Sequence, residues 1–290
     1  MNFTTGAELL ALCSEHGCAI SEIMLRREAE HLETDREKAG AQMARSYEIM
    51  KEAIRTALTS RTRSMGGLIG GEAYAVSAHI ARGRTASGPL AARAAAYAMG
   101  VLEVNASMGL IVAAPTAGSS GVIPGAFVAL QEEYGFSDAQ MVAALFNTAA
   151  VGYLLMRNAS VSGAEGGCQA EVGSASAMAA SGVCELLGGT PEMCLSAASI
   201  AIANVLGLVC DPIAGLVEAP CQSRNAMGVT NALACADIAL SGVRTLIPFD
   251  EMAEAMRRVG RSIPFELRET ALGGTAATPT ACALCKKIFE

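Results

Sequence analysis

Three of the ten cysteines differ from the rest in their surroundings: Cys168, Cys210 and Cys221. Glycine and glutamate precede the first, Asp-Pro follows the second, and a proline directly precedes the third. Cysteines that only fill a core lie more often among Leu, Ile and Ala at helical spacing, as Cys184 and Cys235 do. The contrast predicts that the three distinct cysteines are ligands of one metal centre.

The kind of centre is less clear from the residues alone. Thiolates are the usual ligands of iron–sulfur clusters, and a cluster with three protein ligands leaves one iron able to bind a hydroxyl as a Lewis acid. The separations, from 168 to 210 and then to 221, form no local signature, so zinc and inert thiols stay open as alternatives. Cys282 and Cys285 are spaced like a metal or redox motif, but they stand alone in the tail.

A Gly/Ser loop offers a second candidate site. Between two prolines it holds three hydroxyls and two glycines, and its candidate binding residues are Thr116, Ser119, Ser120 and Gly121. Such a loop ahead of a helix can bind a phosphate or a substrate carboxylate through its backbone N–H groups. No lysine follows in a Walker pattern, which favours the carboxylate. A plain turn between buried helices is the alternative.

Arg224 supplies the positive charge that an anion site needs. It is the only cation between Arg157 and Arg244, and a guanidinium fork suits a carboxylate. Asn225 beside it adds neutral hydrogen-bonding capacity. We predict that both residues bind substrate; the alternative for Arg224 is a buried ion pair with Glu218.

Residues that other chemistries require are missing from the core. Pyridoxal phosphate needs a Schiff-base lysine, and the four lysines lie in a charged helix or at the tail: Lys38, Lys51, Lys286 and Lys287. We therefore expect no pyridoxal phosphate. The histidines precede the core motifs and lack metal-ligand spacing: His16, His31 and His79.

Composition limits the class of protein. A net charge of −7 without a basic patch disfavours nucleic acid as a partner. Uncharged stretches at 104–131, 139–156 and 193–209 are long enough to suggest bilayer spans, so a helical membrane carrier is an alternative. Prolines, glycines and polar residues interrupt two of them, so we expect buried helices and no membrane. The first residues resemble no export signal, which predicts a cytoplasmic protein with reduced thiols.

The patterns predict an all-α fold. We expect helices near 88–111, 125–134, 137–157, 169–188, 191–208, 215–241, 250–260 and 265–270, and almost no strands. Residues 1–63 are charged and form a helical N-terminal arm, with a capping box at Thr5 and Glu8 and a helix over 21–59. A glycine-rich stretch, 64–71, then begins a single large helical catalytic domain, 64–290, and is suited to a hinge or to close approach to a ligand.

Four motifs in order give a family resemblance: 116–125, 163–173, 207–215 with 220–225, and 268–279. Together, over about residues 64–280, they resemble the iron–sulfur-dependent L-serine dehydratase α chain. The resemblance implies a [4Fe–4S] cluster on Cys168, Cys210 and Cys221. It also implies that the serine carboxylate lies on the Thr116 loop with help from Arg224, and that L-serine loses water to give pyruvate and ammonia.

The resemblance leaves several points open. Two-part members carry a second domain on a separate β chain, so we expect such a partner and an oligomer. Some single-chain relatives end in a cysteine that caps the open iron; here Cys285 lies five residues before the end, so that role is assigned neither to it nor to Cys282. The catalytic base is not identified among Glu165, Glu171 and Asp211. A cluster-dependent L-cysteine desulfidase and a non-catalytic helical subunit are the rival functions.

Overall fold

The computed structural model describes residues 1–31 and 33–289. The described chain folds into helices without a β-strand, apart from one isolated bridge between Cys210 and Arg268, which confirms the all-α prediction. The α-helices are α1 Gly6–His16, α2 Ile20–His31, α3 Arg36–Thr59, α4 Glu72–Ile80, α5 Gly88–Ala106, α6 Val122–Tyr134, α7 Asp138–Asn158, α8 Gly163–Gly166, α9 Ser174–Leu186, α10 Pro191–Ala203, α11 Cys221–Leu240, α12 Phe249–Ser262 and α13 Pro279–Phe289. Short helical turns are η1 Ala117–Ser119, η2 Gln169–Gly173, η3 Ile213–Gly215, η4 Phe265–Leu267 and η5 Gly274–Ala277.

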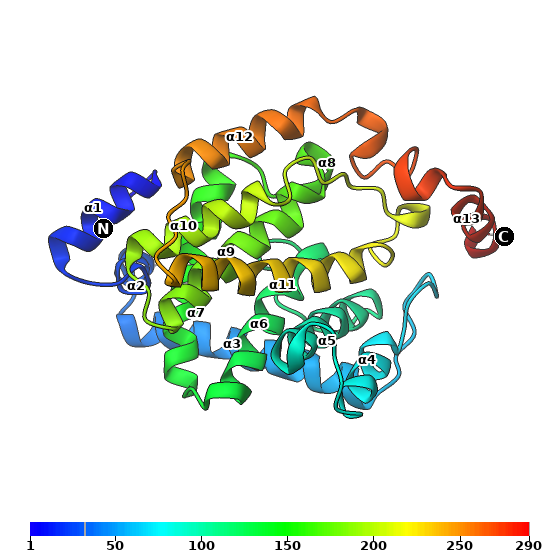
Figure 1. Ribbon diagram of the computed structural model, residues 1–290, viewed down its shortest axis with the longest axis horizontal. Coiled ribbons are helices and arrows are strands. Elements are labelled where there is room, and N and C mark those ends of the chain that lie inside the picture. The colour runs from blue at the N-terminus through cyan, green and yellow to red at the C-terminus, as the bar shows by residue number, and fades with distance from the viewer. Residues whose placement is uncertain (32, 290) are drawn as a thin grey trace.

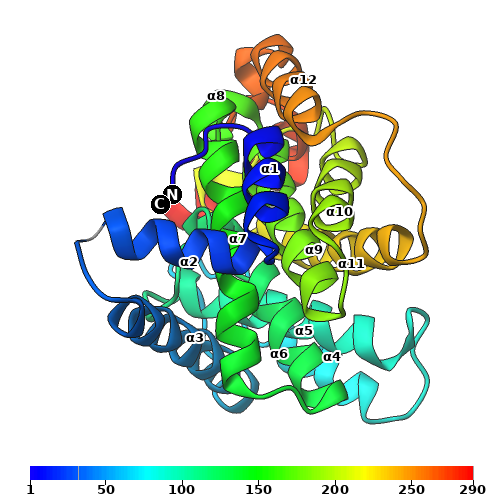
Figure 2. The same ribbon diagram turned by 90° about the vertical axis from the view of Figure 1, so that its left-hand side faces the viewer.

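The centre of the molecule is the helix α9. It packs against α6, α7, α10 and α11, and nearly all of its residues are buried (Figures 1 and 2). Its small side chains allow this close packing: a Cβ at Gly182 would lie 2.6 Å from Thr148 Cγ2 and 2.8 Å from Phe127 Cζ. The many alanine, glycine and serine residues of the chain therefore allow the helices to lie close together.

The N-terminal segment shares this core. Leu9, Ile23, Tyr47 and Ile54 are each at most 3% exposed and belong to the same buried apolar cluster as the later helices. The helix expected over 21–59 is two helices, because Asp35 caps a new one: its side chain accepts a hydrogen bond from the backbone N–H of Lys38. The two chain ends lie at opposite ends of the long axis (Figure 1).

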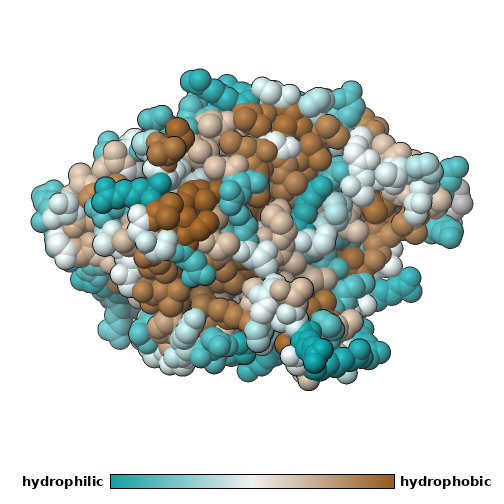
Figure 3. Space-filling view, in the orientation of Figure 1, coloured by the Kyte–Doolittle hydropathy of each residue, from teal (hydrophilic) through white to brown (hydrophobic). Residues whose placement is uncertain are grey.

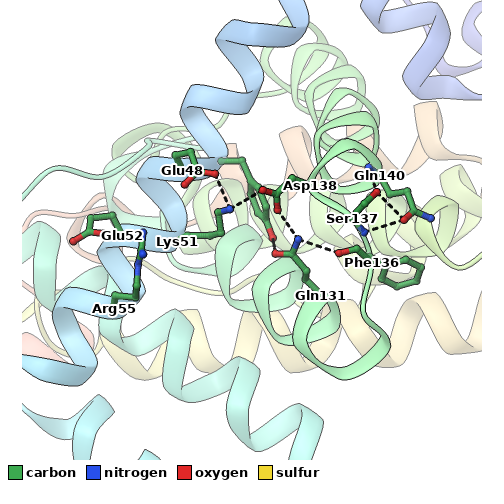
Figure 4. A network of polar contacts seen from close by, with 10 residues as sticks. Glu48, Lys51, Glu52, Arg55, Gln131, Phe136, Ser137, Asp138 and Gln140 are labelled. Carbon is green, nitrogen blue, oxygen red and sulfur yellow. Dashed lines mark hydrogen bonds and ion pairs between the residues drawn. The ribbon is translucent and has the colours of Figure 1, made fainter.

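A polar network ties α3 to α6 and α7 (Figure 4). Lys51 bonds to Glu48 at 2.6 Å and to Asp138 at 3.1 Å. The buried Tyr47 hydroxyl donates to Gln131 Oε1 at 2.6 Å, and Gln131 Nε2 donates to Asp138 Oδ1 at 2.7 Å. These bonds fix the α3 helix against the turn before α7, where Ser137 and Gln140 form a capping box.

Removing the Tyr47 hydroxyl should destabilise this network. We expect Tyr47→Phe to lower the free energy of unfolding by about 1–2 kcal/mol, because Gln131 loses a donor at a buried position. Tyr134→Phe is the matched control, since Tyr134 is 57% exposed. Urea unfolding followed by circular dichroism measures both; equal midpoints for the two variants would show that the network contributes nothing.

Several sequence expectations need correction. The helix predicted over 88–111 ends at Ala106, and that over 191–208 ends at Ala203. The α4 and α13 helices were not predicted. Both are short, and a short apolar run shows the helical periodicity only weakly. Only α7 in the described chain is long and apolar enough to cross a membrane, and 61% of its most apolar window is buried against other helices.

Exposed apolar side chains lie on the molecular surface, several of them in the loop between α11 and α12. Figure 3 shows broad brown areas on the face drawn there. Val243, Leu246 and Ile247, in the loop between α11 and α12, are 55%, 95% and 43% exposed. The same loop borders a cavity of about 560 Å³ that α1, α10 and α12 complete, and none of the predicted site residues lines it.

Candidate metal centre

The three distinct cysteines come from three separate segments. Cys168 lies between α8 and η2, Cys210 lies in the extended chain after α10, and Cys221 is the first residue of α11. They are 2%, 2% and 5% exposed. Ionisation of Cys168 or Cys221 would raise the pKa of the Cys210 thiol, so the three thiols lie within electrostatic reach of one another.

Deprotonating these thiols is costly without a bound cation. Burial raises the pKa of Cys168 to about 11, although the nearby Arg224 charge lowers it. Burial, and then Cys168 and Glu171, raise the pKa of Cys221 to about 12. The pKa of Cys210 is also raised, first by burial and then by Cys168. Three buried thiols that oppose each other's ionisation form a donor set that a positively charged centre would stabilise.

The Cys210 segment is held by the C-terminal motif. The Cys210 backbone N–H donates to Leu267 O at 2.9 Å, and the Glu269 N–H donates to Cys210 O at 2.6 Å. The next residue, Asp211, accepts a bond from the Thr275 N–H at 2.5 Å through Oδ2. The motif around 268–279 therefore positions the second thiol.

Arg224 locks the same segment from the other side. Its Nη1 donates to Val209 O at 2.8 Å and its Nη2 to Asp211 Oδ1 at 2.7 Å, so it grips the residues on both sides of Cys210. The ion pair with Glu218 considered from the sequence is wrong. Glu218 instead accepts bonds from Ser64 Oγ and from backbone N–H groups of the glycine-rich stretch 64–71.

The Thr116 loop is linked to the neighbourhood of the three cysteines through Glu171. Thr116 Oγ1 donates to Glu171 Oε1 at 2.7 Å and lies 3.0 Å from Ser119 Oγ. Glu171 is half-buried, and its pKa is raised by burial. Ser119 and Ser120 are completely buried, and Ser120 Oγ donates to Ala117 O at 2.7 Å. The loop is thus a closed turn whose Thr116 hydroxyl bonds to the glutamate.

Asn225 joins the loop to the third cysteine. Its Nδ2 donates to Gly118 O at 2.8 Å and to Cys221 O at 2.9 Å, while its Oδ1 accepts from the Gly121 N–H at 3.0 Å. The side chain is completely buried. Asn225 therefore connects the loop to Cys221 through its own side chain, and its amide is fully used in holding the loop.

Gly163 lies close to two side chains of the site. A Cβ there would lie 2.9 Å from Cys210 Sγ and 2.8 Å from Glu171 Oε2. No side chain fits without displacing the thiol or the carboxylate. Gly163 begins the motif 163–173, but the sequence predicted no role for it.

We expect Gly163→Ala to reduce bound iron at least about tenfold, because the new methyl group pushes Cys210 Sγ out of place. Gly40→Ala is the matched control, since a Cβ there meets nothing within 4 Å. Iron per chain after anaerobic reconstitution measures the effect. Equal iron in the two variants would mean that the close contact at Gly163 is unimportant.

The three thiols are not grouped as ligands of one single ion. Among the described residues, no three His, Cys, Asp or Glu side chains are grouped closely enough to hold one metal ion. A tetrahedral zinc site needs its ligands around one centre, whereas in a cluster each thiolate binds a different iron. The histidines His16, His31 and His79 are all exposed and lie on other helices.

The fold and the site define a class: an all-helical protein with a buried centre of three thiols beside a hydroxyl-rich loop. A family model described as Serine dehydratase alpha chain matches residues 15–276. The chain belongs to that family.

Individual relatives agree. The "Probable L-serine dehydratase, alpha chain" of Bacillus subtilis is 47% identical over 99% of this chain and 95% of its own length. The "L-serine dehydratase, alpha chain" of Peptoniphilus asaccharolyticus is 45% identical over 95% of this chain and 94% of its own length. The "L-serine dehydratase" of Streptomyces coelicolor is 37% identical over 97% of this chain but only 62% of its own length.

Proposed function

We propose that the protein is the catalytic chain of an L-serine ammonia-lyase, which converts L-serine to pyruvate and ammonia. Family membership and the names of the relatives support the substrate. The observation that carries the chemistry is the meeting of three buried thiols with the Thr116 loop, made through Glu171 and Asn225.

Cys168, Cys210 and Cys221 would hold a [4Fe–4S] cluster. When bound, such a cluster with one iron lacking a protein ligand supplies a Lewis acid for the serine hydroxyl. Burial of the thiols keeps water from the ligands, and Arg224 offsets part of the negative charge of the thiolates. The grip of Arg224 on both neighbours of Cys210 fixes the direction of that ligand.

The substrate carboxylate would lie between the Thr116–Gly121 loop and Arg224. The guanidinium uses one N–H of Nη1 and one of Nη2 on the Cys210 segment, which leaves donors for a carboxylate. Thr116 is half-buried and borders this place, and the completely buried Ser119 hydroxyl, 3.0 Å from Thr116 Oγ1, helps to position it. Ser120, Gly121 and Asn225 hold the loop in shape for this contact.

Glu171 is the carboxylate best placed to remove the α-proton. Glu165 is exposed and accepts a bond from Ser160 Oγ, and both oxygens of Asp211 are occupied by Arg224 and Thr275. Glu171 bonds to Thr116 through Oε1, so Oε2 can accept the proton of a serine held on that loop.

A second chain should complete the enzyme. The similar proteins of Bacillus subtilis and Peptoniphilus asaccharolyticus are named as alpha chains, and the present chain spans about 62% of the Streptomyces coelicolor relative. We infer that a β chain supplies the missing part, that the assembly is oligomeric and that it works in the cytoplasm.

Anaerobic purification tests the proposal. We expect about four irons and four sulfides per chain, a brown colour, and serine-dependent pyruvate once the β chain is added. L-Cysteine in place of L-serine tests the desulfidase alternative through sulfide release. A reconstituted protein that stays colourless and iron-free would refute the cluster, and cluster-loaded protein active only on L-cysteine would refute the substrate.

A further inference from the structure

A second cavity, which is polar, lies close to Cys168 but apart from the proposed substrate residues. It has a volume of about 350 Å³ and lies between α12 and the segment 159–170 that leads to Cys168. Three arginines and one acid lie on its wall: Arg257, Arg261, Arg268 and Glu165. None of the residues assigned to the serine carboxylate lines it.

Arg268 brings an unsatisfied buried donor to this wall. Its Nε has no hydrogen-bond partner within the described chain, and its Nη1 makes only a long 3.5 Å bond to Glu165 O. A buried donor without an acceptor costs about 1–3 kcal/mol, so native proteins usually supply a water or an ion for it. The guanidinium of Arg268 therefore has no firm partner within the described chain.

The positive charge on the wall is only partly balanced. Arg257 pairs with Glu254 through Nε at 2.5 Å and Nη2 at 2.6 Å. Arg261 is exposed and has no carboxylate within 4.0 Å among the residues that the structure describes. The Glu165 carboxylate accepts a bond from Ser160 Oγ at 2.6 Å. Guanidinium groups from two segments thus face one polar cavity of small-molecule size.

We propose that this cavity binds a small organic oxyanion, one that carries a phosphate or two carboxylates. Arg268 and Arg261 bind it through charge-assisted hydrogen bonds, and Arg257 adds long-range attraction. The backbone at Arg268 bridges to Cys210, while the opposite wall leads to Cys168. A bound anion therefore links the segments that carry two of the three thiols and stabilises the folded chain around them.

Calorimetric titration of the full-length chain tests the site, with inorganic phosphate and malonate as the two probes. Ionic strength is held constant with sodium chloride. We expect at least one probe to bind saturably and to raise the unfolding midpoint. Arg261→Gln should weaken that binding about tenfold, because it removes an exposed charged donor without disturbing the fold. Arg244→Gln, an exposed arginine on the loop after α11, should bind as the unaltered chain does.

Arg268→Gln gives a second measure and should weaken binding at least as much. Should that variant fail to fold, Arg261→Gln still decides. Saturation by phosphate alone identifies a phosphate site, and saturation by malonate alone identifies a dicarboxylate site. The proposal is overturned when neither probe saturates, or when Arg261→Gln and Arg244→Gln bind equally well. Calorimetry needs no turnover, so the outcome is independent of whether L-serine is the substrate.

Discussion

Replacing any one of Cys168, Cys210 or Cys221 with alanine should remove nearly all bound iron and abolish serine-dependent pyruvate formation. Each thiol comes from a different segment, and each is buried, so no exposed neighbour replaces a lost ligand. A cluster with two protein ligands and two open irons is expected to be lost rapidly to solvent. The loss should be close to complete, from about four irons per chain to near zero.

Cys184→Ala is the matched control for this prediction. Cys184 is also completely buried, but it lies in α9 among alanine and glycine, and its loss should cost only about 1 kcal/mol of packing. Iron and sulfide content after anaerobic reconstitution, together with the visible spectrum, separates the two groups. A full cluster in any of the three ligand variants would refute the assignment. Lost iron in Cys184→Ala would show that the test reports general instability.

The fold class was predictable because helix signals are local. Thr5 caps α1 as the sequence predicts, since its side chain accepts a hydrogen bond from the Glu8 N–H, and the missing β-branched runs excluded a sheet. The break between α2 and α3 was missed although Asp35 is a typical N-cap residue, because the apolar pattern continues on both sides of it. The local signals were sufficient for element type but not for every boundary.

The contacts of the site were less predictable. The surroundings of Cys168, Cys210 and Cys221 singled them out, since a cysteine that only fills a core lies more often among Leu, Ile and Ala than beside glycine, proline or aspartate. The partner of Arg224 was missed: Asp211 lies thirteen residues before it, and Glu218 is nearer in the chain. Pairings such as Cys210 with Leu267 and Glu269 join segments far apart in sequence, and such contacts leave no periodic signal.

Glu171→Gln should lower kcat for L-serine by about 10²–10⁴ while leaving iron content unchanged. Glutamine keeps the side-chain length and the oxygen that accepts the bond from Thr116, so the loop should hold its shape. It cannot accept the α-proton at the second position, because an amide nitrogen is no base. The effect should fall on kcat more than on KM, since proton removal belongs to the transition state.

Exchange of the α-hydrogen isolates this step from the loss of water. L-Serine is incubated with cluster-loaded enzyme in deuterium oxide, and any deuterium in the recovered serine reports reversible removal of the α-proton. In a separate experiment, L-serine labelled with deuterium at the α-carbon tests whether the C–H bond breaks in the slow step. Glu185→Gln serves as control, because this half-buried acid bonds to Asn147 on α7, away from the thiols, and should keep its activity. A Glu171→Gln enzyme whose kcat lies within about threefold of the kcat of the unaltered enzyme would exclude Glu171 as the base. The base would then have to come from elsewhere, and the β chain would be the first place to look for it.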